Sequence, residues 1–192
     1  RRELHKHPEL SFEEQNTQRL IIESLQSEGI ECRAIAGTGV LAKIEGERGN
    51  HRRCVVLRAD IDALPIKELN DIDYCSQNEG VMHACGHDAH TAILIATVKA
   101  LFEIKDEVAC RVRFIFQPSE ECPVSGAKMM VDNGVMIEDY SDFPLDGMYG
   151  ELIDESILNA DKTVAAVAGY LPADRPYSDT VAFLRERIAD EG

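Results

Sequence analysis

The chain has 192 residues, 44% of them hydrophobic, so it is long enough to bury a core of ordinary size. Its formal net charge of −15 disfavours nucleic acid and anionic membrane as partners, because their phosphates would be repelled. The sequence contains no run of about 18 apolar residues, the length needed to cross a membrane. Its first residues also lack the apolar core of a secretory signal. We therefore expect a cytoplasmic protein that binds neither membrane nor nucleic acid.

Helix and strand patterns alternate along the first part of the chain. Hydrophobic residues recur at helical spacing between residues 8 and 26, behind a Ser11–Glu14 pair with the spacing of a capping box. This pattern predicts a helix. A short strand is expected over 37–44, and a second strand, buried on both faces, over 54–58, where the hydrophobic run is almost continuous.

The alternation continues beyond residue 90. A helix is predicted over 91–104, a buried strand over 111–116 and a further helix over 125–131, and residues 145–149 fit another sheet edge. Strands that alternate with helices indicate an α/β sandwich. The pattern weakens from residue 151, where we expect helices over 153–168 and 177–189.

Most of the cysteines and the first two histidines are better interpreted as structural residues than as metal ligands. The cysteines lack the short paired spacings of a zinc ribbon or a redox motif, so we expect most of them to be reduced core residues. They are Cys32, Cys54, Cys75, Cys85, Cys110 and Cys122. His5 and His7 are expected to have a structural role in the turn before Pro8.

Residues 83–90 concentrate histidine, cysteine and aspartate in the sequence HACGHDAH. Imidazole, thiolate and carboxylate are the ligands that zinc prefers. Cys85 and His87 would share a face in an extended loop, which the glycine between them favours. Two alternatives stay open: a helical site that pairs His83 with His87, or loop residues that cap a helix beginning near Thr91.

Carboxylates follow two of the predicted strands, where sites of open α/β sheets gather. Of the adjacent Glu120 and Glu121, one can bind metal while the other takes a proton from water and returns it to a leaving amine. The alternative is a solvated acidic turn. Asp60 and Asp62 end a strand, where a carboxylate can orient a ligating histidine or be held by backbone amides in a turn.

Four of these segments together carry a resemblance to a known family. They are residues 2–11 (RELHKHPELS), 57–65 (LRADIDALP), 82–91 (MHACGHDAHT) and 115–121 (IFQPSEE). In this order they resemble the amidohydrolase branch of the dinuclear metallopeptidases, which includes hippurate hydrolases, indole-acetyl-amino-acid hydrolases, N-acetyldiaminopimelate deacetylases and related carboxypeptidases. Four ordered motifs argue against chance similarity.

The resemblance implies a fold, a site and a reaction. The fold would be a three-layer α/β sandwich with a mixed, largely parallel sheet of the zinc-exopeptidase type. Cys85, His87 and Glu121 would bind metal, Glu120 would act as general base and acid, and Asp62 would support a ligand from behind. A complete site would hold two divalent ions, which are zinc, manganese, cobalt or nickel. The substrate would be an N-acyl amino acid or a small peptide, cleaved at its amide bond.

The sequence departs from the family after about residue 150. Where the family has a Gly-Leu-His sequence with a further metal ligand, this chain has Gly150, Glu151 and Leu152, and no histidine follows His90. Replacement of that ligand by Glu151 is the less favoured interpretation. The family's dimerisation domain and the closing half of its catalytic domain have no counterpart in the pattern, so the predicted fold is incomplete.

These departures define the expected organisation and an alternative function. We expect residues 1–150 to form part of a metallohydrolase catalytic domain, and residues 151–192 to form an acidic, helical tail unlike the family. The chain would then be a fragment, a truncated gene product or an inactive relative, with weakened metal binding. The alternative function is a non-catalytic metal-binding or interaction module. Exposed sheet surface would be covered by the tail or by a homo-oligomer.

Overall fold

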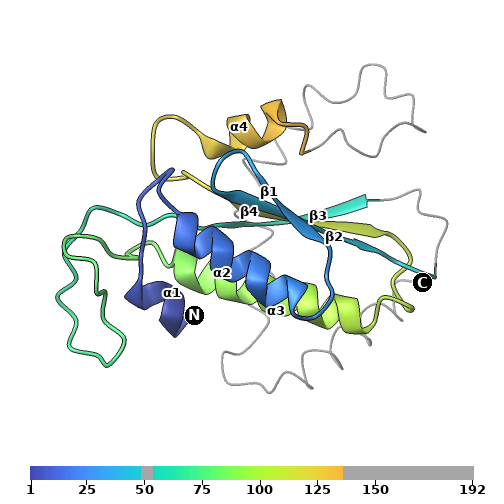
Figure 1. Ribbon diagram of the computed structural model, residues 1–192, viewed down its shortest axis with the longest axis horizontal. Coiled ribbons are helices and arrows are strands. Elements are labelled where there is room, and N and C mark those ends of the chain that lie inside the picture. Colours follow the sequence, from blue (N-terminus) through green and yellow to red (C-terminus); the bar gives the residue numbers. More distant parts are fainter. Residues whose placement is uncertain (49–53, 136–192) are drawn as a thin grey trace.

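The computed structural model describes residues 1–48 and 54–135 (Figure 1). In this part of the chain, none of the helices combines the length and the hydropathy needed to span a membrane. The expected elements over 145–149, 153–168 and 177–189 lie outside the described residues.

Four strands form one mixed sheet in the order β1-β2-β4-β3. The strands are β1 (Cys32–Ile35), β2 (Gly39–Glu45), β3 (Cys54–Asp60) and β4 (Arg111–Gln117). β1 pairs with β2 and β2 with β4 in antiparallel fashion, whereas β3 and β4 are parallel. A mixed sheet is confirmed, but the described strands are not largely parallel. The reason lies partly in the turn after β1, where Ala36 and Gly37 take positive φ angles and fold β2 straight back on β1.

Helices cover both faces of this sheet, so the layers are helix, sheet and helix (Figure 1). The helices are α1 (Arg2–Lys6), α2 (Gln15–Gln26), α3 (His87–Glu103) and α4 (Gly126–Asp132). α2 and α3 lie side by side on one face, and α4 lies on the other (Figure 1). The three-layer α/β arrangement predicted for the fold is therefore present.

The core follows the alternation of side chains along the strands. Val40, Ala42 and Ile44 of β2 and Phe114 and Phe116 of β4 are buried in the larger cluster, with residues of α2 and α3. The residues between them face α4, in a smaller cluster formed by Ile35, Ala36, Leu41, Ile115, Met130 and Val135. This period of two explains why β4 was predicted almost to the residue.

β3 differs from its prediction. Val55 and Val56 are 46% and 38% exposed, so the strand is not buried on both faces. β3 lies at the edge of the described sheet and has one strand neighbour, β4. Burial increases only toward its carboxyl end, where Ala59 and Asp60 are buried. The site is built at that end.

α2 begins later than its capping pattern predicts. Its first residue is Gln15, because the hydroxyl of Ser11 donates to Asp62 Oδ2 rather than to a helix amide. The amides at the start of α2 are instead bound by the carboxylate of Glu9, which accepts from the backbone N–H groups of Asn16 and Thr17. The capping box was therefore a wrong interpretation of the Ser11–Glu14 pair.

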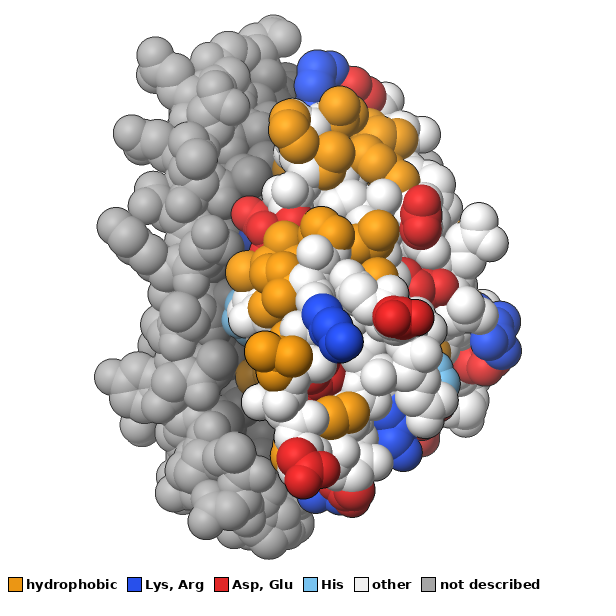
Figure 2. Space-filling view, turned by 90° about the vertical axis from the view of Figure 1, so that its left-hand side faces the viewer, with side chains coloured by type: hydrophobic (Ala, Val, Ile, Leu, Met, Phe, Trp, Pro, Cys, Tyr) orange, Lys and Arg blue, Asp and Glu red, His pale blue; other side chains and the backbone are white. Residues whose placement is uncertain are grey.

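A long loop joins β3 to α3 and lies at the left of Figure 1. It is tied down at a few points, such as the paired backbone hydrogen bonds between Leu64 and Met82. Three of its hydrophobic side chains, Ile66, Leu69 and Ile72, are exposed. Figure 2 shows the face that carries this loop, with hydrophobic side chains interspersed among charged ones.

Candidate metal centre

The candidate site lies beyond the carboxyl ends of the two parallel strands. Asp60 ends β3 directly beside Gln117, the last residue of β4. The chain continues from β3 to Asp62 and from β4 to Glu120 and Glu121. α3 lies between β3 and β4 in the sequence and begins at His87. Polar residues that are far apart in sequence therefore meet at one edge of the sheet, as expected for an open α/β fold.

The three predicted metal ligands come together. One ligand atom each of Cys85, His87 and Glu121 can be chosen so that all three lie within 4.8 Å of one another. The Oε1 atom of Glu121 is buried without a hydrogen-bond partner among the described residues and lies 3.7 Å from His87 Nε2. A buried carboxylate oxygen without a partner is costly, and a bound cation would supply one. The donor set fits a divalent ion of the zinc type.

Asp62 fixes the orientation of His87. The Nδ1–H group of His87 donates to the Asp62 backbone carbonyl at 3.0 Å, and Nδ1 also lies 3.2 Å from Asp62 Oδ1. These contacts leave Nε2 as the nitrogen that faces the other ligands. Asp62 is in turn held by the Ser11 hydroxyl and by the backbone N–H of Glu121, both at Oδ2. The predicted supporting position of Asp62 and the alternative of a carboxylate held by backbone are thus both present.

The charges around His87 shift the pKa values of the site. Burial by itself would raise the pKa of Asp62, but hydrogen bonds from His87, Glu121 and Ser11 outweigh it and lower the pKa to about 2. Burial would lower the pKa of His87, whereas Asp62 and the neighbouring carboxylates raise it to about 9. Hydrogen bonding to Glu121, burial and nearby carboxylates raise the pKa of the Cys85 thiol to about 11. A metal ion would therefore displace protons from Cys85 and His87 on binding.

Glu120 has the surroundings of a proton carrier. Its Oε2 atom lies 3.9 Å from His87 Nε2, and its side chain is 37% exposed. Burial and the adjacent charge of Glu121 raise the pKa of Glu120 above its usual value. Glu120 therefore stands beside the ligand set with an accessible carboxylate whose pKa lies closer to neutrality, which suits proton transfer.

α3 begins four residues earlier than predicted, and this difference adds a residue to the site. Gly86 takes a φ of 84° just before the helix, so the helix begins at His87 instead of near Thr91. The alternative that loop side chains cap this helix is not present, because its N-cap residue is Gly86 and no side chain caps it. The hydroxyl of Thr91 donates to the Asp60 carbonyl. His87 and His90 are three apart on the helix and so share a face.

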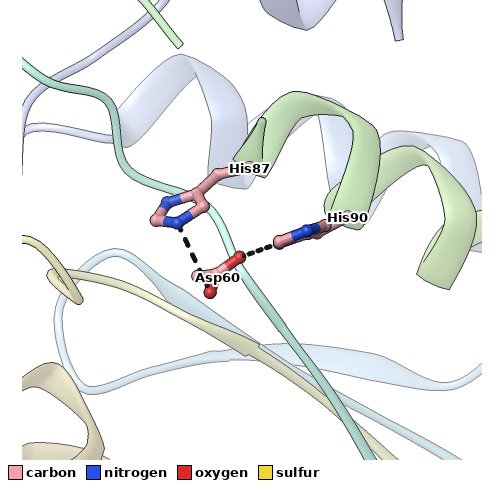
Figure 3. A group of neighbouring side chains, drawn as sticks. All are labelled: Asp60, His87 and His90. Atoms are coloured by element: carbon pink, nitrogen blue, oxygen red, sulfur yellow. Dashed lines mark hydrogen bonds and ion pairs between the residues drawn. The ribbon is translucent and has the colours of Figure 1, made fainter. Parts of the chain in front are cut away.

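His90 faces the site and was missing from the predicted ligand set. Figure 3 shows His87 and His90 on either side of Asp60. His90 Nδ1 lies 2.7 Å from Asp60 Oδ1, and His87 Nε2 lies 3.5 Å from Asp60 Oδ2. The signal that could have identified His90 was its spacing of three from His87, which becomes visible only once the helix is known to begin at His87.

The alternative pair of His83 and His87 on a helix is not present. His83 lies in the turn before α3, and its buried ring nitrogens have no hydrogen-bond partner among the described residues. Burial lowers the pKa of His83 to about 4. His5 is buried between two carboxylates: its Nδ1 lies 2.7 Å from Asp88 Oδ2 and its Nε2 3.0 Å from Glu68 Oε1. This agrees with a structural role for His5.

Comparison with known proteins identifies the family. A model of peptidase family M20/M25/M40 matches residues 56–184, about two thirds of the chain. The chain belongs to peptidase family M20/M25/M40. The matched range extends past residue 150, where the resemblance of the motifs ends, and the division of the chain at residue 150 stays a prediction.

Curated relatives of this M20 chain are hydrolases. An N-acyl-L-amino acid amidohydrolase from Geobacillus stearothermophilus is 47% identical over 137 residues, which are 71% of this chain and 36% of the relative. Thermostable carboxypeptidase 1 from Saccharolobus solfataricus is 45% identical over 139 residues, which are 71% of this chain and 35% of the relative. The chain thus spans about a third of the length of these relatives.

A solved structure supports the fold. The YXEP protein of Bacillus subtilis, described as a dinuclear metal binding peptidase from the M20 family, superposes with a TM-score of 0.67 at 43% identity. The superposition covers 71% of this M20 chain and 38% of the YXEP protein. The fold described above is therefore part of the M20 catalytic fold.

Proposed function

We propose that this M20 chain is part of a metal-dependent hydrolase that cleaves the amide bond of N-acyl amino acids or small peptides. The observation that carries the proposal is the convergence of Cys85, His87 and Glu121 within 4.8 Å, with Glu120 beside them. The names of the curated relatives, an amidohydrolase and a carboxypeptidase, support the same reaction class.

Each residue has a distinct task in this proposal. Cys85, His87 and Glu121 would hold a divalent ion, which would polarise the substrate carbonyl and make water more acidic. The backbone carbonyl of Asp62 accepts a hydrogen bond from Nδ1–H of His87 and so would keep Nε2 turned toward the ion. Glu120 takes a proton from the attacking water and passes it to the amine that leaves.

The ions that we propose are zinc, manganese, cobalt or nickel, two per complete site. A dinuclear metal centre in the B. subtilis relative supports the number two. We propose a location in the cytoplasm, because the cysteines of this chain lack the short paired spacings and the small chain size of a disulfide scaffold. A homo-oligomer is proposed as one way to cover the exposed edge of the sheet.

The test measures bound metal and hydrolysis separately. We expect the chain to bind zinc, manganese or cobalt, and to release the amino acid from N-acetyl or N-benzoyl substrates. Glu120→Gln is expected to lower the turnover rate by at least roughly 100-fold while metal content stays the same, because it removes only the proton carrier. Glu79→Gln, an exposed loop position, is the matched control. Hydrolysis that survives Glu120→Gln would show that Glu120 is not the base.

A non-catalytic metal-binding module is the second candidate. It is favoured by one observation: where the family has a Gly-Leu-His sequence with a further metal ligand, this chain has Gly150, Glu151 and Leu152. This candidate predicts stoichiometric metal with no hydrolysis of any of these substrates. The first candidate predicts both.

A further inference from the structure

We infer that Asp60, His87 and His90 form a second cation site, which competes with the set of Cys85 and Glu121 for the same nitrogen of His87. The inference rests on the proposed metal assignment only in its use of His87. Carboxylate plus two imidazoles is a ligand set that suits a divalent transition-metal ion with open positions for water.

The three side chains are already gathered. Asp60 ends β3 and is 4% exposed, and His87 and His90 lie on the first turn of α3 above it (Figure 3). One ligand atom of each lies within 4.8 Å of the others. The two imidazole rings are stacked, with their centroids 5.6 Å apart and their planes 30° from parallel. Both rings therefore face the same carboxylate from one turn of helix.

The distances are close to those around a single ion. Metal bonds of roughly 2.0–2.2 Å place neighbouring ligand atoms roughly 3.0–3.5 Å apart. His87 Nε2 and Asp60 Oδ2 are separated by 3.5 Å. His90 Nδ1 and Asp60 Oδ1 are 2.7 Å apart and share a hydrogen bond, so an ion would displace its proton and widen this contact by a few tenths of an ångström.

His87 cannot serve both ligand sets at once. Its Nδ1–H group is bound to the Asp62 carbonyl, so only Nε2 has a lone pair for a metal. Nε2 lies at nearly equal distances from the two sets: 3.5 Å from Asp60 Oδ2 and 3.7 Å from Glu121 Oε1. An ion that takes this nitrogen toward one set removes it from the other.

The chemistry of the two sets predicts which ion takes which. Thiolate favours zinc, cobalt and cadmium at the set with Cys85, whereas carboxylate and imidazole without sulfur accept manganese. Arg58 lies 3.7 Å from Asp60 Oδ2 and adds a positive charge near the second site. Ions at Asp60 are therefore expected to bind more weakly than ions at the thiolate set.

The experiment titrates the full chain with Mn²⁺, followed by electron paramagnetic resonance, and with Co²⁺, followed by absorption. Cys85→Ser is expected to abolish the thiolate-to-cobalt absorption band and to retain one Mn²⁺. His90→Gln, with Asp60→Asn as a second variant, is expected to weaken Mn²⁺ binding at least roughly 10-fold. His7→Gln, outside the site, is the control for loss of a histidine. Circular dichroism checks that each variant is folded.

Competition tests the shared nitrogen. One equivalent of Zn²⁺ is expected to release the bound Mn²⁺ from the parent chain. Cys85→Ser is expected to need a higher Zn²⁺ concentration for the same release, because Zn²⁺ then competes only by binding directly to Asp60, His87 and His90. The inference is overturned if folded His90→Gln and Asp60→Asn bind Mn²⁺ like the parent, or if Zn²⁺ and Mn²⁺ bind together without competition. These readouts do not depend on hydrolysis, so a chain that binds Mn²⁺ through His90 yet cleaves no substrate would contradict the proposed function and uphold this inference.

Discussion

The imidazole of His87 is the residue on which the site depends. On one side its Nδ1 atom is held by Asp62, and on the other its Nε2 atom faces the carboxylates of Asp60, Glu120 and Glu121 at 3.5 to 3.9 Å. One ring therefore joins the end of β3 to the loop after β4. Its orientation is set by Asp62 rather than by the ligands themselves.

Asp62→Asn is expected to weaken zinc binding roughly 10- to 100-fold. The amide can still accept at Oδ1, but it brings no negative charge to His87 and cannot accept from both Ser11 and the Glu121 amide in the same way. Isothermal titration calorimetry with Zn²⁺ measures the effect. Asp71→Asn, at an exposed loop position, is the matched control. Equal affinity in both variants would mean that Asp62 does not orient the ligand.

Glu14 gives a prediction of pH dependence away from the metal ligands. It is fully buried between the hydroxyl of Thr38 and the backbone N–H of Ser119, and burial raises its pKa. A raised pKa in the folded state means that its contribution to stability is present at low pH and is lost as the pH rises through the folded pKa.

Glu14→Gln is therefore expected to gain stability relative to the parent as the pH rises from about 4 toward neutrality. Gln can still accept from Ser119 and can donate to Thr38, so shape and hydrogen bonding are retained. Urea unfolding at several pH values measures the difference in free energy of unfolding between the two proteins. A difference that stays constant with pH would contradict the raised pKa.

At the scale of elements, the loop between β4 and α4 depends on the absence of a side chain at Gly126. A Cβ atom there would lie 1.8 Å from the backbone oxygen of Pro118, and the Gly126 N–H donates to Ser119. This close approach of α4 to the loop holds the backbone that carries Glu120 and Glu121. The start of α4 is thus coupled to the site.

Gly126→Ala is expected to cost roughly 1–3 kcal/mol of stability and to weaken metal binding, because the Pro118 backbone must shift. Gly29→Ala is the control: its φ of 77° makes alanine strained by roughly 1–2 kcal/mol, but no atom lies within 4 Å of the new Cβ. Urea unfolding and Zn²⁺ titration compare the two. If both variants bind zinc like the parent, the Gly126 contact does not position the loop.

The bounds of a helix or strand could be predicted where the local sequence alone determines them. β4 follows from alternating hydrophobic residues between two helical layers, and its bounds were expected within one residue. The starts of α2 and α3 were wrong for reasons that lie outside the local pattern. The hydroxyl of Ser11 donates to Asp62, 51 residues away. Gly86 takes a positive φ directly before α3 and so sets its first residue. Neither effect is visible in the spacing of hydrophobic residues.

The same division holds for the site. Cys85, His87, Glu120 and Glu121 could be predicted because they stand in dense motifs after strands, and their convergence follows from one parallel strand pair. His90 was missed because it depends on the true start of α3. The sequence offers no signal that the side chains of Glu14, Glu68 and Asp88 are shielded from solvent, since their partners come from distant segments.

At the scale of the molecule, metal binding is expected to protect the site and little else. Hydrogen exchange should already be slowest in β2 and β4, which lie in the middle of the described sheet, and fast in the exposed part of the loop before α3. Added Zn²⁺ is expected to slow exchange in peptides that cover residues 83–91 and 117–122, and removal with a chelator should reverse it. α2 serves as the internal control. Uniform protection across all peptides would instead indicate that zinc stabilises the whole fold.

The parallel register that places Asp60 beside Gln117 also sets the distances between the metal-binding residues that follow the two strands. A slip of one residue between β3 and β4 would move their ends by about 3.3 Å, more than the length of a metal–ligand bond, which tolerates only about 0.2 Å of error. The register is locked by the packing of Phe114 and Phe116 under the helices. A core substitution that shifts β3 against β4 is therefore expected to weaken metal binding, because the residues that follow the two strands would no longer meet.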